Sequence, residues 1–202
     1  TAYPNIVFIP VNEKKVPVSK GWEKTAKPPT AADLADWQTR AYSVGVVCGK
    51  ANGNLEVLDF DQKGKAYDAF KYAVDSHDKT ILASLPIVRT PSGGYHVYYR
   101  CANIEGNQKL AETAKHETII ETRGQGGQVV APRTVLPDGT EYKLISAIDI
   151  DKTPTISPKV RQAFLTICRS LTEAPAKPIH EHERKGRPGD DYNQRTKWSD
   201  IL

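Results

Sequence analysis

The chain has 202 residues and a formal net charge of +4, with 26% charged and 39% hydrophobic residues. This balance is typical of a globular protein, and the lack of any apolar run of about 20 residues excludes a helix that crosses a membrane. Because no secretory signal opens the chain, we expect a cytoplasmic protein with no membrane partner. Its mild basicity is compatible with a polyanionic ligand.

Three cysteines, Cys48, Cys101 and Cys168, are odd in number and far apart, and their spacing fits no metal site. They predict reduced, partly buried thiols rather than a disulfide pair. The chain contains no methionine. We therefore expect residue 1 not to be a natural start and the chain to be part of a longer protein.

The first part of the chain is predicted to combine short strands with two helices. Thr30 is a suitable N-cap for the first helix, with Asp33 in its first turn. Two β-rich runs flank turn-forming residues at 49–54, so we expect those runs to form a hairpin. The predicted elements are a strand at residues 6–9 with a partner at 14–18, a helix at 30–37, strands at 42–48 and 55–61, and a helix at 65–74.

The later part is richer in strands and closes with a helix, for which Pro158 after Ser157 is a suitable start. The predicted strands are residues 87–89, 95–100, 118–121, 128–131 and 141–145, and the helix is 158–171. These elements predict one α+β unit over residues 1–172 with mostly antiparallel pairing. A charged, proline-rich linker is expected at 173–197 and the start of a truncated downstream element at 198–202.

An acidic pair ends the strand predicted at 55–61. Asp59 and Asp61 are two positions apart and so project from the same face, while Phe60 packs on the opposite face. Two like charges held side by side repel unless a cation lies between them, and Mg²⁺ prefers carboxylate oxygens. The alternative is that one aspartate caps the following helix and the other is a solvated strand end.

A glycine-rich turn with polar side chains follows the strand predicted at 87–89. Gly93 and Gly94 allow the backbone to approach an anion closely, and Ser92 and His96 add a hydroxyl and a ring nitrogen. Together they form a candidate phosphate grip. The alternative is an ordinary hairpin with a satisfied strand histidine.

A third motif lies where the strand predicted at 118–121 ends. Glu121 is a candidate third carboxylate, and Arg123, before a second glycine-rich turn, can pair with a phosphate through two hydrogen bonds. The alternative is a surface ion pair beside a tight hairpin. The three motifs combined are the parts that metal-assisted nucleotidyl transfer needs: carboxylates for two ions about 3.5–4 Å apart, and donors for the triphosphate.

The three motifs resemble those of the bifunctional primase/polymerase domain of phages and plasmids, within the archaeo-eukaryotic primase superfamily. That family has an acidic pair, then a loose Ser-x-His motif, then an acidic residue that closes a strand. Residues 57–61, 90–96 and 120–132 match in this order, and the resemblance covers roughly residues 4–145. The implied fold has an α/β half and an RRM-like half with flanking helices, with the site in the cleft between them.

The resemblance implies a role for each candidate site residue. The divalent ions, Mg²⁺ or Mn²⁺, would be held by Asp59, Asp61 and Glu121. The family usually has aspartate where this chain has Glu121, so metal spacing or preference can differ. The residues implied to bind the incoming dNTP or NTP are Ser92, Gly93, Gly94 and His96, with Arg123 and Lys50 as helpers. A single-stranded DNA template would approach over Lys20, Trp22, Arg89 and Arg100, for which a solvated charge or a core aromatic is an equal alternative.

The implied activity is primer synthesis or extension by a phage or plasmid replication protein, whose full-length form carries a C-terminal helicase or helical module. Two other functions stay open. One is a catalytically weak nucleic-acid-binding module of a primase-helicase, and the other is a two-metal nuclease. The nuclease gives no reason for the Ser-Gly-Gly-x-His turn.

Overall fold

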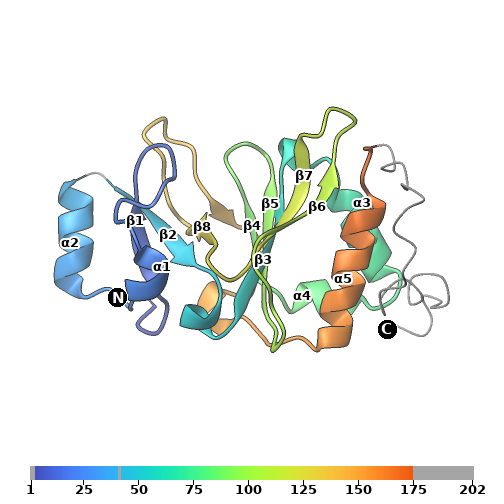
Figure 1. The fold of residues 1–202 in the computed structure, drawn as a ribbon, viewed down its shortest axis with the longest axis horizontal. Coiled ribbons are helices and arrows are strands. Elements are labelled where there is room, and N and C mark those ends of the chain that lie inside the picture. Colours follow the sequence, from blue (N-terminus) through green and yellow to red (C-terminus); the bar gives the residue numbers. More distant parts are fainter. Residues whose placement is uncertain (1–2, 41, 175–202) are drawn as a thin grey trace, which may run out of the picture.

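Two antiparallel sheets and a set of helices build the molecule in a computed structural model that describes residues 3–40 and 42–174. A three-stranded sheet has the order β1-β2-β8, and a six-stranded sheet has the order β6-β7-β3-β5-β4-β9 (Figure 1). The strands are β1 (Phe8–Val11), β2 (Ser43–Val47), β3 (Leu55–Phe60), β4 (Ile87–Arg89), β5 (Tyr95–Arg100), β6 (Gln108–Glu112), β7 (Thr118–Arg123), β8 (Gln128–Val130) and β9 (Lys143–Leu144). All strand ladders are antiparallel, which confirms the predicted α+β class.

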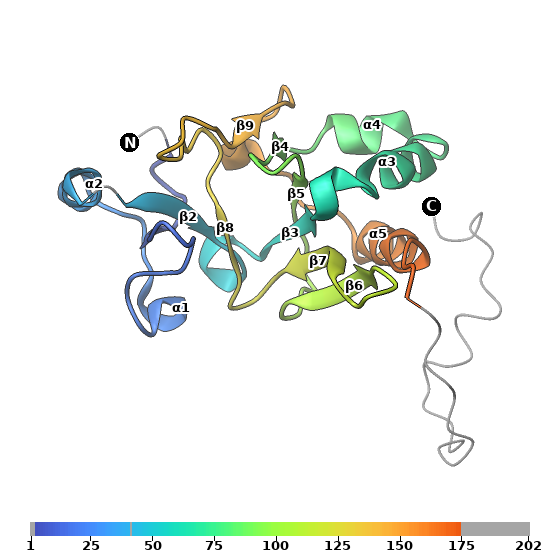
Figure 2. The same cartoon turned by 90° about the horizontal axis from the view of Figure 1, so that it is seen from above.

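The helices lie at the two ends of the molecule (Figures 1 and 2). They are α1 (Trp22–Thr25), α2 (Ala31–Thr39), α3 (Tyr67–Asp75), α4 (Lys79–Ala83) and α5 (Pro158–Ser170), with short 3-10 turns η1 (Lys50–Asn52), η2 (Gln62–Gly64) and η3 (Ile150–Lys152). Helices α3, α4 and α5 cover one face of the six-stranded sheet, whereas α1 and α2 flank the three-stranded sheet. Thr30 and Asp33 form a capping box on α2, and Ser157 caps α5, as the sequence predicts.

Strand β3 is the centre of the fold because both of its faces are covered. All six of its residues are buried, and it pairs with β5 on one side and β7 on the other. Phe60 faces the helices and packs on Phe70 of α3, with ring centroids 5.1 Å apart. Val57 faces the other way, into a second core between the two sheets. The burial of every residue of this strand follows from its having a core on each side.

A buried charge network joins α5 to the central strand. Glu56 is fully buried, and its carboxylate accepts hydrogen bonds from Arg161 Nε at 2.6 Å and from Arg161 Nη2 at 2.9 Å. The hydroxyl of Tyr99 on β5 donates a third bond to Glu56 at 2.7 Å. Because each oxygen has a partner, the charge of Glu56 is accommodated in the core.

The predicted hairpin of residues 42–48 with 55–61 is wrong. The first run, β2, pairs with β1 and β8, and the second run, β3, lies in the other sheet. The turn between them crosses from sheet to sheet, and buried Asn52 stabilises the crossing. Its amide accepts from the N–H of Val7 at 2.7 Å and donates to the carbonyls of Val7 and Val47. Local propensity cannot predict this role of Asn52, because its hydrogen bonds to Val7 join residues far apart in the chain.

Other differences from the predicted elements are smaller. Residues 14–18 form no strand, and the only bridge there pairs Val11 with Pro17. Strand β6 and helix α4 were not predicted, because β6 has a largely polar sequence with irregular pairing and α4 has only five residues. The three cysteines are buried free thiols, as predicted. Within residues 3–40 and 42–174, no helix has the length and apolar character that crossing a membrane requires. Most of the predicted linker and all of the predicted downstream element lie outside the described residues.

Candidate active site

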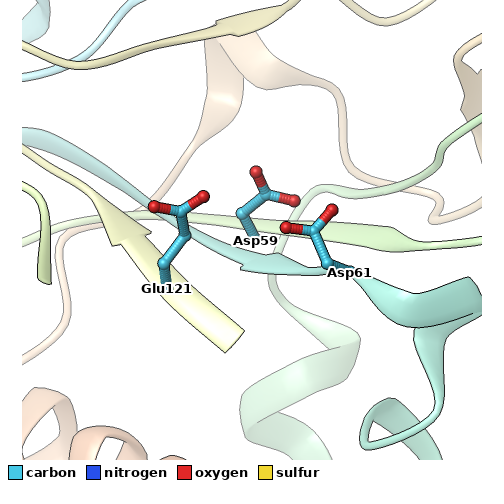
Figure 3. Close-up of side chains that lie close together, drawn as sticks. All are labelled: Asp59, Asp61 and Glu121. Atoms are coloured by element: carbon cyan, nitrogen blue, oxygen red, sulfur yellow. The ribbon is translucent and has the colours of Figure 1, made fainter. Parts of the chain in front are cut away.

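Three carboxylates meet at the end of the central strand. Asp59 on β3 is directly opposite Glu121 on the neighbouring strand β7, and Asp61 follows β3 by one residue. Their side chains point to the same side of the sheet (Figure 3). One oxygen from each carboxylate lies within 4.8 Å of the others. The structure therefore brings together the three acidic residues that the sequence singles out.

The electrostatics of this acidic triad, Asp59, Asp61 and Glu121, favour a bound cation. Burial raises the pKa of Asp61, and the nearby charge of Asp59 raises it further. Burial also raises the pKa of Glu121, where the two aspartates oppose the lowering effect of Arg123. Three carboxylates this close together offer oxygen ligands that suit a hard divalent ion such as Mg²⁺ or Mn²⁺.

Arg123 is the cation that the fold itself supplies to the triad. Its side chain is about one-third exposed and forms a hydrogen bond to Glu121, while its Nε lies 3.4 Å from Asp59 Oδ2. One guanidinium thus serves two of the three carboxylates. Asp61 has no ion pair among the described residues, so the negative charge of the triad is only partly offset.

The turn between β4 and β5 packs against the end of β3. A Cβ atom at Gly94 would lie 2.3 Å from the carbonyl oxygen of Phe60, so only glycine permits this close approach. The N–H groups of Gly93 and Gly94 donate to the backbone oxygen and the hydroxyl of Thr90, both at 2.9 Å. These two groups therefore hold the turn together, and the Ser92 hydroxyl, 3.0 Å from that of Thr90, is the group left to meet a ligand.

His96 lies beside the triad on β5. It is paired with Asp59 across the β3–β5 ladder, and its Nε2 atom is 3.5 Å from Asp59 Oδ1. Burial lowers the pKa of His96, against the raising effect of Asp59. The ring is therefore neutral at pH 7 and carries one N–H donor. Its Nδ1 atom is 3.4 Å from the Tyr98 hydroxyl.

Asp59 and Asp61 of the triad line a cavity of about 300 Å³ together with Thr90 and Ser92 of the turn between β4 and β5. Its walls come from both sheets and from the chain after β1. The lining residues are Lys14, Lys15, Asp59, Asp61, Thr90, Ser92, His96, Arg123, Gln128, Val129, Val130 and Tyr142. The expected position of the site, between two halves of the fold, agrees with this geometry.

The remaining candidates lie elsewhere. Lys50 is in η1, next to the opposite end of β3 from Asp59, and its backbone N–H donates to Gln125. Trp22 packs on the outer face of the three-stranded sheet, with exposed Lys20 just before it. Arg100 is tied to the carbonyls of Asn52 and Thr153, which is a structural role. Of the four proposed template contacts, only exposed Arg89 adjoins a cavity residue, Thr90.

Sequence reasoning missed several residues of the cavity. Lys14, Lys15 and Tyr142 reach it from segments that carry no catalytic pattern, and Gln128, although it lies within the third motif, was not singled out. Their positions depend on how the two sheets pack, and a single sequence gives no signal of that packing. The charge of Lys15 lowers the pKa of Asp61, against the larger raising effect of burial.

The mixed fold of antiparallel sheets with few helices is consistent with the archaeo-eukaryotic primase class. Residues 2–159 match the family model of the bifunctional DNA primase/polymerase, N-terminal domain. The chain therefore belongs to this family, which confirms the resemblance seen in its three motifs. Comparison with curated proteins found no match. Membership of the family implies an enzyme of the nucleotidyltransferase type that depends on a metal.

Replacing Gly94 by alanine should disturb the site without touching a functional side chain. The added Cβ atom meets backbone at Phe60 and the hydroxyl of Thr90, so the turn has to move. We expect a loss of about 1–3 kcal/mol in stability from overpacking, and about a 100-fold lower rate of primer extension if Ser92 shifts by about 1 Å. Thermal unfolding and a primer-extension assay measure the two effects.

Gly106→Ala is the matched control, because its Cβ atom would meet only Gln125 O at 3.7 Å, an ordinary contact. We expect this variant to retain wild-type stability and activity. Equal behaviour of the two variants would show that the close packing of the turn on β3 is unimportant.

Proposed function

We propose that this domain is a primase/polymerase that adds dNTPs or NTPs to a primer on a single-stranded DNA template, with two divalent ions, Mg²⁺ or Mn²⁺, held by Asp59, Asp61 and Glu121. The observation that carries this proposal is a shared cavity, in which two of these carboxylates face Ser92 and His96. Carboxylates for metal ions and neutral donors for phosphate, facing each other, suit nucleotidyl transfer better than hydrolysis of a bare phosphodiester.

Each residue has a specific role in this proposal. When bound, the ions would stabilise the charge that develops on the attacking and leaving oxygens. The Ser92 hydroxyl and the His96 N–H donate hydrogen bonds to the triphosphate, and Gly93 and Gly94 give their turn its shape. A cation held by Asp59 and Glu121 would take these carboxylates over from Arg123, whose guanidinium could then pair with a phosphate oxygen. Arg89, exposed beside the cavity, is the best placed of the proposed template contacts.

Two further parts of the proposal rest on the family resemblance. One is that the domain belongs to a phage or plasmid replication protein. The other is that a C-terminal helicase or helical module follows it in the full-length protein. The sequence beyond Thr172 supports a linker leading to such a module, because it is rich in proline and charge.

The test is to incubate the domain with primed and unprimed single-stranded templates, nucleotides and Mg²⁺ or Mn²⁺. Metal-dependent lengthening of the primer supports the polymerase, and products on the unprimed template add priming activity. Shortening of the DNA indicates the two-metal nuclease instead. Template binding without any product indicates a binding module, and it would overturn the catalytic proposal for this chain.

Metal binding should stabilise the fold, most strongly at neutral pH. The folded state raises the pKa of Asp61 and Glu121, so their ionisation opposes folding above those pKa values and ceases to do so when the pH falls through them. In EDTA we therefore expect the melting temperature to rise as the pH is lowered through the raised pKa values towards the ordinary range of a carboxyl group. Mn²⁺ at pH 7 should raise it too, because the ion binds only the folded state.

Asp61→Asn removes the charge of Asp61 with little change in side-chain shape, and its melting temperature is measured in the same way. In EDTA at pH 7 this variant should be more stable than the wild type, since it removes one of three repelling charges, and Mn²⁺ should stabilise it much less. Asp68→Asn, at an exposed position of α3, is the control and should respond to Mn²⁺ like the wild type. An Asp61→Asn protein with the full Mn²⁺ response would exclude Asp61 as a ligand.

A further inference from the structure

One wall of the active-site cavity is a basic turn that follows β1. Its residues Lys14 and Lys15 line the same cavity as Asp59, Asp61 and Ser92. Both lysines are exposed, and neither belongs to any of the three motifs. They reach the cavity from the three-stranded sheet, while the triad and Ser92 come from the six-stranded sheet or its turns.

The turn is held in one conformation. The Asn12 side-chain oxygen accepts from the N–H groups of Lys14 and Val16, both at 3.0 Å, and the Asn12 N–H donates to the carbonyl of Val16 at 2.9 Å. Lys15 has a φ of 62°, an uncommon value for a residue other than glycine. Gln128 Nε2 donates to the Lys15 carbonyl at 2.9 Å and so ties the turn to β8. The backbone at Lys15 is therefore fixed with respect to the cavity.

The Lys15 side chain extends towards the triad. Its ammonium group lies 5.5 Å from the ring centroid of Tyr142, and that ring is 5.8 Å from the ring of His96. His96 in turn contacts Asp59. Among the described residues, neither Lys14 nor Lys15 forms an ion pair with a carboxylate, whereas Arg123 is already bound to two. Lys15 thus places a positive charge at the cavity that no carboxylate among the described residues neutralises.

We propose that Lys15, assisted by Lys14, binds the triphosphate of the incoming nucleotide in the cavity that Ser92 and His96 also line. This inference rests on the proposed function and names a residue that completes its substrate site. The three carboxylates already offset much of the charge of the metal ions, so the negative charge of the triphosphate has to be met by other cations. Lys15 occupies the same cavity as the metal ligands, and this favours the triphosphate over the backbone of a DNA strand as its ligand.

The test measures nucleotide binding without turnover. A non-hydrolysable dNTP analogue and the matching monophosphate are titrated calorimetrically into the 202-residue chain in Mn²⁺. Loss of a hydrogen bond between two charged groups predicts a dissociation constant for the triphosphate about 10- to 100-fold higher in Lys15→Ala. Binding of the monophosphate should be unchanged. Lys15→Arg should restore most of the affinity, and Lys14→Ala should have a smaller effect than Lys15→Ala.

The matched control is Lys24→Ala in α1, an exposed lysine that does not line the cavity. Equal triphosphate affinity in Lys15→Ala and wild type would overturn the inference while leaving the proposed function intact. An equal loss for monophosphate and triphosphate would also overturn it, as would a loss confined to single-stranded DNA binding. If the wild type binds no nucleotide in Mn²⁺, the proposed function itself fails.

Discussion

Asp59→Asn should lower the rate of primer extension by about 1,000-fold or more, the largest effect that we expect from a single substitution. Asp59 is the triad member in contact with both Arg123 and His96, so it links the metal side to the phosphate side of the cavity. Removing the charge of a shared metal ligand costs several kcal/mol of transition-state stabilisation, and about 4 kcal/mol corresponds to about three powers of ten in rate. Single-turnover extension of a labelled primer measures the loss.

Asp68→Asn is the matched control, because it removes the same charge from the protein. It should keep wild-type activity, since Asp68 is exposed on α3. We expect the melting temperature of Asp59→Asn in EDTA to be no lower than that of the wild type. The loss of activity would then not result from misfolding. Substantial extension by Asp59→Asn in either metal would contradict the assignment of the triad.

Glu121 allows a finer comparison, because aspartate carries the same charge on a side chain that is one methylene shorter. Glu121→Gln should lose activity as Asp59→Asn does, whereas Glu121→Asp keeps the charge and should keep part of the activity. The relative rates in Mg²⁺ and Mn²⁺ then report whether the longer side chain sets the metal preference. Full activity of Glu121→Gln would remove Glu121 from the site.

Arg161→Ala should destabilise the protein by about 3–5 kcal/mol, the largest expected effect on stability. The substitution leaves the carboxylate of Glu56 fully buried with only the Tyr99 hydroxyl as partner, and an uncompensated buried charge carries a cost of this size. For a domain of this length we expect a melting temperature lower by about 6–20 °C. Chemical and thermal unfolding measure the change directly.

The control is Arg169→Ala on the same helix, where the side chain is exposed and donates a hydrogen bond to Gln108. We expect this change to stay within about 0.5 kcal/mol of the wild type. Replacing the whole network, in the triple variant Glu56→Leu, Tyr99→Phe and Arg161→Met, should recover most of the lost stability because no buried charge remains. A triple variant as unstable as Arg161→Ala would show that packing, not charge, explains the loss.

The sequence predicts the elements of this fold better than their arrangement. Local signals were sufficient for α2, with Thr30 and Asp33 as its capping box, and for α5, with Ser157 as its cap. They failed for β2 and β3, because the choice between a hairpin and a crossing depends on the buried side chain of Asn52 and on its partners, Val7 just before β1 and Val47 on β2. Such contacts join residues far apart in the chain, and no local propensity encodes them.

In the candidate site, too, the sequence predicts some residues and not others. Alternation along one strand places Asp59 and Asp61 on one face, and the motif pattern adds Glu121, Ser92 and His96, which the structure brings to the same place. Lys15 and Tyr142 could not be predicted, because they enter the cavity only through the packing of the two sheets. The family resemblance made Lys50 and Arg100 candidates, and their places, in η1 and at the far end of β5, depend on the same packing.

The order of strands in the small sheet has a consequence for synthesis on the ribosome. Strands β1 and β2 are made early, but their third partner, β8, and the cavity residue Tyr142 emerge only after β3 to β7 have been translated. The β1–β2 pair therefore has to wait with one edge unpaired, and a nascent chain that already contains Asp59 and Asp61 has no closed cavity around them. The cavity around the carboxylates can therefore close only late in translation, when nearly the whole folded unit has left the exit tunnel.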